Sequence, residues 1–523
     1  MLQMIKHALF AGTLSAVGVA IFYLLLSPAV RREFGYRPGI AAVIIPLVAF
    51  MAPHLAVLQV LMLLLVPALA RTRDDILPIF IVGLIMMPML GKPIIIGSLY
   101  LFPLSTVLML SLGAIATMWM KPGRSSPHRI WTDIPFWIVF LLLFFIAARD
   151  QSATSVMRQF LIVGFAVIPP YYLVSRLVRS VEDARRPMLG LVLVGSICSV
   201  ILAFEAVRFW PMYVELVTRF DVEGAVASHV SMRAGLLRAS GPMLQSTAMA
   251  FVMSLCLLSG YALRRAFPTK FHWFAMLAVL AVGMIAPQSR NAWLGVATGL
   301  VMVEMFRGHV MRMGAVLAFF GALGGIVYVA VADNDRVAES VGASGTATGT
   351  AEYRQQLLRR GLEEYHKAPL LGAPAEVVNS RLQDLVQGEG IIDYVNTYLY
   401  LALFSGAVGL GAFLLALVIE LATLGLQRPR WRKFPAELDI AAYAFGSIVM
   451  VAQMLIFTSF GDKAVTLYLM SFAIAAGLIS GRRKGGGVAS VSPKRIVHPG
   501  MVVAGNLPSL QQADGEDGHR QPA

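Results

Sequence analysis

Long apolar stretches recur along almost the whole chain, from Phe10 to Leu478, and this feature limits the possible folds more than any other. A helix needs about 20 consecutive, mainly apolar residues to cross a bilayer. Only 14% of the 523 residues are charged, against roughly 25% in an average soluble domain. The pattern excludes an ordinary soluble enzyme and predicts an all-α, polytopic integral membrane protein.

The apolar stretches predict about 14 transmembrane helices, within a range of about 13–15. The stretch 40–69 contains Pro46 and Pro53, so it forms either one tilted helix or a hairpin of two short helices. The expected spans are 8–30, 40–69, 76–90, 94–119, 132–148, 156–175, 187–208, 243–263, 271–287, 291–307, 312–331, 396–424, 438–459 and 463–480.

The formal net charge of +14 comes from Lys and Arg residues that stand in small groups between the apolar stretches. A nucleic-acid-binding protein would gather them in one basic patch, so no nucleic-acid partner is expected. From the third stretch onward, alternate connections hold most of the basic residues, which places these connections in the cytoplasm. The two long connections, 209–242 and 332–395, then lie on the other side of the membrane.

The long connection 332–395 contains an amphipathic helix over 351–367. Its Tyr353, Leu357, Gly361 and Tyr365 recur at every fourth residue and so share one helix face. The chain as a whole is expected to divide into N-terminal transmembrane helices (1–230), transmembrane helices with arginine motifs (231–331), the long outer loop (332–395), C-terminal transmembrane helices (396–481) and a disordered cytoplasmic tail (482–523).

Three arginines stand close to membrane entry points on the predicted outer side. Arg290 lies in a very short turn between two apolar spans, and Arg233 and Arg238 precede the span that begins at Pro242. Charges at such a depth are costly and usually functional. Guanidinium groups match phosphate oxygens and keep their charge near lipid, so these arginines predict a site for a lipid-linked phosphate or pyrophosphate. The alternative is that each one anchors a helix end to lipid headgroups.

The sequence offers little for a metal ion or a cofactor. Cys198 and Cys256 both lie within apolar spans, which excludes a disulfide framework and a cysteine-based metal site. Neither a Gly-rich phosphate-binding loop nor an HExxH motif occurs. We expect no metal and no cofactor.

A group of short motifs carries a family resemblance. Asn396 is followed nine residues later by Gly406-Ala407-Val408-Gly409, just where the outer loop enters the membrane. Three more matching segments are Arg238–Gln245, Ser289–Gly295 and Pro369–Gly372. With these motifs, residues 230–425 resemble the O-antigen ligase and O-antigen or exopolysaccharide polymerase superfamily of membrane glycosyltransferases, in which a His-Asn pair precedes the GxxG element.

The resemblance implies roles for the arginines. In that family, arginines bind the pyrophosphate of an undecaprenyl-linked glycan, and this role falls on Arg238 and Arg290. Arg354, on the amphipathic loop helix, is expected to close over the same group, and Arg233 and Asn396 are expected to bind substrate.

The family histidine is replaced by Val395, which can neither accept a proton nor donate a hydrogen bond. Asp393, two residues earlier, is the carboxylate that could act as the general base in its place. The alternative is that Asp393 caps the helix that begins near Asn396. Loss of the histidine favours a polymerase over a ligase.

The resemblance therefore implies a metal-independent glycosyltransferase in the bacterial inner membrane, with its active face in the periplasm. It is expected to polymerise exopolysaccharide or O-antigen repeat units. The alternatives are an O-antigen ligase and, in a different class, a flippase for the same lipid-linked sugar. Expected partners are the undecaprenyl-pyrophosphate-linked glycan, membrane lipids and other polysaccharide export components.

Overall fold

The computed structural model describes residues 2–97, 99–122, 129–222, 232–233, 235–333, 346–386, 392–459 and 462–481. Residues Met1–Arg482 form one compact unit. The predicted disordered tail, 482–523, lies outside the described residues.

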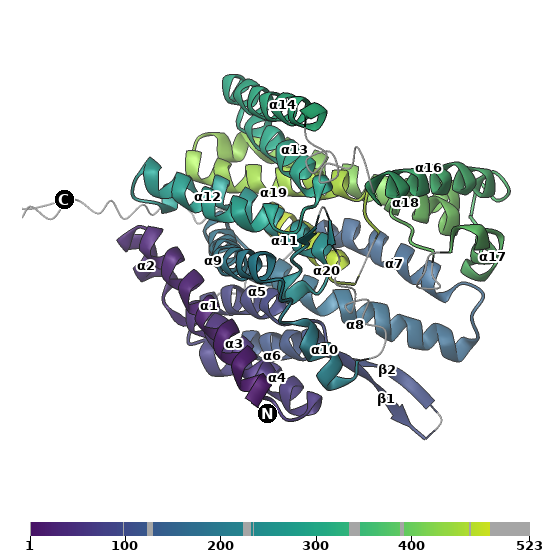
Figure 1. Cartoon of the computed structure of the whole chain (residues 1–523), viewed down its shortest axis with the longest axis horizontal. Helices are drawn as coiled ribbons and strands as arrows, with labels where there is room; N and C mark the ends of the chain where they lie inside the picture. Colours follow the sequence, from purple (N-terminus) through teal and green to yellow (C-terminus); the bar gives the residue numbers. More distant parts are fainter. Residues whose placement is uncertain are drawn as a thin grey trace, which may run out of the picture. The chain divides into compact units, whose positions relative to one another are not determined.

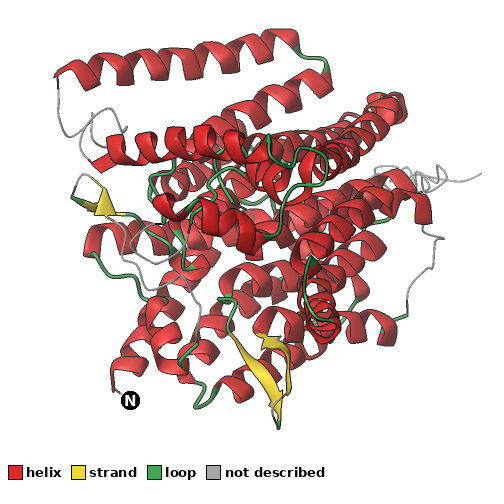
Figure 2. Ribbon diagram, turned by 90° about the vertical axis from the view of Figure 1, so that its right-hand side faces the viewer, coloured by secondary structure: helices red, strands yellow, loops and turns green. Residues whose placement is uncertain are grey.

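Helices account for most of the described chain (Figures 1 and 2). The first part contains α1 (Leu2–Leu25), α2 (Pro28–Phe34), α3 (Arg37–Met51), α4 (Leu55–Leu69), α5 (Ile76–Met86), α6 (Thr106–Met120), α7 (Ile134–Ala148), α8 (Ala153–Leu177), α9 (Val181–Arg208) and α10 (Val214–Phe220). The second part contains α11 (Ser246–Ala262), α12 (Lys270–Ile285), α13 (Arg290–Arg307), α14 (Val310–Asp333), α16 (Thr346–Tyr365), α17 (Ala375–Arg381), α18 (Thr397–Arg432), α19 (Pro435–Met454) and α20 (Asp462–Ser480).

The fold class is all-α, and the helices indicate a membrane protein. Among the described residues, six helices are long and apolar enough to cross a membrane, and the bent pair α2 and α3 would make a seventh span. Other apolar stretches form shorter helices, such as the 11-residue α5. The full number of about 14 spans stays a prediction.

Two stretches differ from simple spans. The predicted helix over 94–119 is wrong in its first part, because β1 (Gly91–Ile96) and β2 (Leu99–Ser105) form an antiparallel hairpin and the helix starts only at Thr106. Pro93 and Pro103 face each other in this hairpin, and neither can donate a backbone hydrogen bond to a helix. The stretch 40–69 forms two helices, α3 and α4, separated at Ala52–His54.

The basic connections meet one another at one end of the helix bundle. Arginines of one basic connection form ion pairs with acidic residues of another. These pairs are Arg37–Asp75 (2.9 Å), Arg185–Glu33 (3.0 Å), Arg186–Asp74 (3.7 Å) and Arg265–Asp439 (3.2 Å). We call this end the basic end. Helix α12 runs from Lys270, beside this end, to Ile285, and α13 returns from Arg290 to Arg307. Residues 286–290 are therefore at the opposite end.

Candidate functional site

Two segments far apart in the sequence lie together at the end opposite the basic end. Arg233 Nη1 donates a hydrogen bond to the Gln288 carbonyl (2.9 Å), and Arg238 Nε donates to the Pro287 carbonyl (3.2 Å). The Ala239 amide donates to the Ala286 carbonyl (3.3 Å). These bonds bring both arginines to the start of α13, where Arg290 is the first residue.

The turn after Arg238 is held by a buried acid that the sequence did not single out. Glu205, near the end of α9, is fully buried, and its Oε2 accepts hydrogen bonds from the amides of Ser240 (3.2 Å) and Gly241 (2.9 Å). Gly241 has a φ of +49°, a left-handed conformation that side chains disfavour. Glu205 therefore fixes the backbone that presents Arg238.

Four arginines form a cluster. Arg233, Arg238, Arg290 and Arg354, here called the arginine cluster, lie within electrostatic range of one another. Burial, and then the charges of the other three, lower the pKa of Arg238 to about 10. Burial and the neighbouring arginine charges also lower the pKa of Arg233, and burial and Arg290 lower that of Arg354. All four remain protonated at neutral pH, so the site attracts anions.

The fourth arginine comes from α16, the predicted amphipathic helix of the long loop. Leu357 is almost fully buried on one face of α16, whereas the Arg359 side chain is 81% exposed. A Cβ at Gly361 would lie 2.9 Å from Leu399 of α18, so α16 packs closely on α18 (Figure 1). Arg354 is partly buried. Its Nε has no hydrogen-bond partner among the described residues.

Asp393 lies beside the arginine cluster. The Tyr353 hydroxyl donates a hydrogen bond to the Asp393 carbonyl (3.1 Å), and the Asp393 charge acts on both Tyr353 and Arg354. Burial, and then the Asp393 charge, raise the pKa of Tyr353. A carboxylate is thus present next to the arginines, as a general base would require.

Asn396 has a structural role. Its Oδ1 accepts hydrogen bonds from the amides of Tyr398 (3.0 Å) and Leu399 (3.1 Å), so Asn396 is the N-cap of α18. The alternative interpretation of Asp393 as this cap is wrong, because Asp393 precedes the cap by three residues. Whether Asn396 also binds substrate stays a prediction.

The two glycine motifs meet at a break in α18. Gly406 has φ +66° and ψ −165°, which interrupts the helix. The freed amides of Ala407 and Val408 donate to the carbonyls of Pro369 (2.8 Å) and Leu370 (3.1 Å). In the opposite direction, the Ala373 amide donates a hydrogen bond to the Leu403 carbonyl of α18 (2.8 Å), which the break in the helix leaves free. We call residues 368–373 together with 403–408 the loop–helix joint.

Both glycines of the joint leave no room for a side chain. A Cβ at Gly406 would lie 2.2 Å from the Leu370 carbonyl oxygen, and one at Gly372 would lie 2.5 Å from the Leu403 carbonyl oxygen. Arg149, which follows α7, also holds the joint, because its Nη1 donates to the carbonyls of Leu371 (2.6 Å) and Phe404 (3.3 Å). Arg149 was not among the site residues predicted from the sequence.

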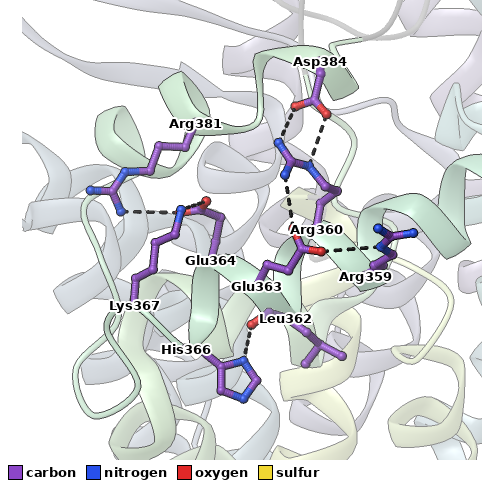
Figure 3. A network of polar contacts seen from close by, with 9 residues as sticks. All are labelled: Arg359, Arg360, Leu362, Glu363, Glu364, His366, Lys367, Arg381 and Asp384. Carbon is purple, nitrogen blue, oxygen red and sulfur yellow. Dashed lines mark hydrogen bonds and ion pairs between the residues drawn. The ribbon is translucent and has the colours of Figure 1, made fainter.

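Ion pairs connect α16 with the segments that follow it (Figure 3). Arg360 contacts Glu363 (3.1 Å) and Asp384 (3.3 Å). Glu364 is paired with both Lys367 and Arg381. Burial on its own would raise the pKa of Glu364. The hydrogen bonds and positive charges of Lys367 and Arg381 have the larger combined effect, so the pKa is lowered. These pairs fix α16 against α17 on the approach to the joint.

Within the described ranges, no three His, Cys, Asp or Glu side chains gather closely enough to hold a metal ion. The charged side chains that the structure brings together at the site include four guanidinium groups and the Asp393 carboxylate. No family model and no curated protein matches this chain.

Proposed function

We propose that this protein is a membrane glycosyltransferase that acts on an undecaprenyl-pyrophosphate-linked oligosaccharide at the periplasmic face of a bacterial inner membrane. The observation that supports the proposal best is the convergence of four arginines and Asp393 at the end of the bundle opposite the basic end. By the positive-inside rule, the basic end faces the cytoplasm, so the arginine cluster faces the periplasm.

The charge of the cluster suits a pyrophosphate. Arg233, Arg238, Arg290 and Arg354 repel one another, and a bound polyanion relieves this repulsion. Guanidinium groups contact phosphate oxygens in pairs, which adds geometric selectivity to the attraction. When the sugar is transferred, negative charge accumulates on the departing pyrophosphate, and fixed arginines stabilise that charge.

The proposed reaction is a single displacement. A hydroxyl group of the acceptor sugar attacks the anomeric carbon of the donor and forms a new C–O bond. The bond between that carbon and the pyrophosphate oxygen breaks, and the electron pair leaves with the lipid pyrophosphate. Asp393 takes the hydroxyl proton, with Arg354 beside it. Attack opposite the leaving group inverts the configuration at the sugar carbon.

Polymerisation of exopolysaccharide or O-antigen repeat units is the reaction we favour. Val395 stands where the resembling family has the histidine associated with ligation. A ligase that transfers the glycan to another acceptor is the closest alternative. A flippase for the same lipid-linked sugar is an alternative of another class, since arginines at a membrane surface can also guide a phosphate headgroup. Other polysaccharide export components are the proposed protein partners.

The lipid-linked sugars of cells that lack the protein separate these functions. Accumulation of a single repeat unit on the periplasmic side of the membrane is the result expected of a missing polymerase. Long chains that stay on the lipid carrier would indicate a ligase. A single unit confined to the cytoplasmic leaflet would indicate a flippase and would contradict the proposal.

A further inference from the structure

A second polar site lies inside the helix bundle, and it is formed by residues that the proposed reaction does not use. It is centred on Asp133, which is 3% exposed and directly precedes α7. Its carboxylate accepts hydrogen bonds from the Tyr171 hydroxyl (2.7 Å) and from Arg176 (2.8 and 3.3 Å), both on α8. One arginine therefore compensates the charge of Asp133.

Glu420 of α18 is the second acid at this place. Its side chain is 2% exposed, and its Oε1 has no hydrogen-bond donor among the described residues. Asp133 acts on it electrostatically, and Glu420 in turn acts on Tyr171 and on Tyr468 of α20. Asp133 is thus ion-paired with Arg176, whereas Glu420 has no ion pair among the described residues.

A buried carboxylate without donors is very unfavourable in a low-dielectric interior, and such a group neutralises by binding a proton. Glu304 of α13, equally buried, illustrates the other solution. It receives a hydrogen bond from Tyr261 (2.8 Å) and pairs with Arg307 and with His309 (2.9 Å). Glu304 therefore has the partners of an ion, whereas the described part of the chain supplies no ion pair to Glu420 and no donor to its Oε1.

We propose that Glu420 is a proton-binding site inside the membrane bundle, and that its carboxyl group carries a proton at neutral pH. Release of the proton would put a second negative charge close to that of Asp133 between α18 and the start of α7, which favours the protonated form of Glu420. This proposal is independent of the proposed glycosyl transfer.

Infrared spectroscopy of the purified, full-length protein at neutral pH tests the proposal. The carbonyl stretch of a protonated carboxylic acid is separate from the carboxylate bands. The difference spectrum between the parent and Glu420→Gln should contain this stretch, whereas the difference between the parent and Glu304→Gln should contain only carboxylate bands. A Glu420→Gln protein with an undiminished carboxylic-acid band would overturn the proposal.

Thermal unfolding of the same two variants provides a second measurement. A glutamine amide resembles a protonated carboxyl group in size and charge, so Glu420→Gln should unfold at the parent temperature. Glu304→Gln removes an ion from the pair with Arg307 and should unfold at a clearly lower temperature. If Glu420→Gln is as unstable as Glu304→Gln, Glu420 is an ion and the proposal is wrong.

Discussion

Replacing Gly406 by alanine should separate the outer loop from α18. The backbone at Gly406 has φ +66° and ψ −165°, a region that is essentially limited to glycine and costs a side-chain-bearing residue about 1–3 kcal/mol. The new Cβ would also lie 2.2 Å from the Leu370 carbonyl oxygen, and relieving such an overlap costs about 1–3 kcal/mol.

The two costs together are about 2–6 kcal/mol. This is similar to the free energy contributed by the hydrogen bonds that hold the loop–helix joint together. The backbone hydrogen bonds of Ala407, Val408 and Ala373, with the bonds from Arg149, are each worth about 0.5–1.5 kcal/mol. We therefore expect local separation of residues 368–373 from α18, with the remaining helix bundle folded.

Trypsin digestion of the purified protein measures this separation, because Lys367 directly precedes the joint. Gly406→Ala should be cut faster at Lys367 and should unfold at a lower temperature. The matched control is Gly411→Ala, on the same helix with no atom within 4 Å of the new Cβ. The control should gain up to about 1 kcal/mol from helix propensity. Equal cleavage and equal unfolding temperatures in the two variants would refute the reasoning.

Four other outcomes are expected. Arg290→Lys keeps the charge but loses the paired contact to phosphate, so membrane insertion should persist and most polymer synthesis should be lost; parental synthesis would rule out this role. Asp393→Asn should abolish transfer without lowering the unfolding temperature, since Asn396 provides the helix cap; an active variant would remove Asp393 from the mechanism. Glu205→Ala leaves the buried Gly241 amide unpaired, at about 1–3 kcal/mol, together with the partly buried Ser240 amide, and should lower the unfolding temperature, whereas Glu205→Gln should restore much of it; an equally stable alanine variant would show that Glu205 does not hold this turn. A cysteine at Ser380, exposed on α17, should react with a membrane-impermeant maleimide in intact spheroplasts; reaction only after lysis would place the loop in the cytoplasm.

Most helix boundaries could be predicted from hydropathy alone, because an apolar run of sufficient length has few other solutions in a membrane. Helix α9 (Val181–Arg208) contains the expected span 187–208, and α20 (Asp462–Ser480) starts within one residue of the expected 463–480. The β1–β2 hairpin could not be predicted in this way, since an apolar strand and an apolar helix have the same mean hydropathy. Pro93 and Pro103 were the residues in the sequence that could have indicated an interruption of the predicted helix.

Arg233, Arg238 and Arg290 could be singled out from the sequence because they stand at membrane entry points on the predicted outer side, where a charge within the membrane is costly. The structure brings them together, and their role in binding stays a prediction. The residues that position them could not be singled out in this way. Glu205 and Arg149 act through backbone amides and carbonyls of distant segments, and no local pattern identifies such contacts. Glu420 was missed for a different reason, since one acid within a long apolar helix gives no indication of which neighbours lack a counter-charge.

Reconstitution of the purified protein in vesicles with an undecaprenyl-pyrophosphate-linked repeat unit tests glycosyl transfer most directly. The parent protein should produce a ladder of longer lipid-linked glycans and release undecaprenyl pyrophosphate, and Arg290→Lys, folded to the same extent, should leave the donor one unit long. A parent protein that leaves the donor unchanged, or that moves it across the bilayer without releasing undecaprenyl pyrophosphate, would contradict the assignment as a glycosyltransferase.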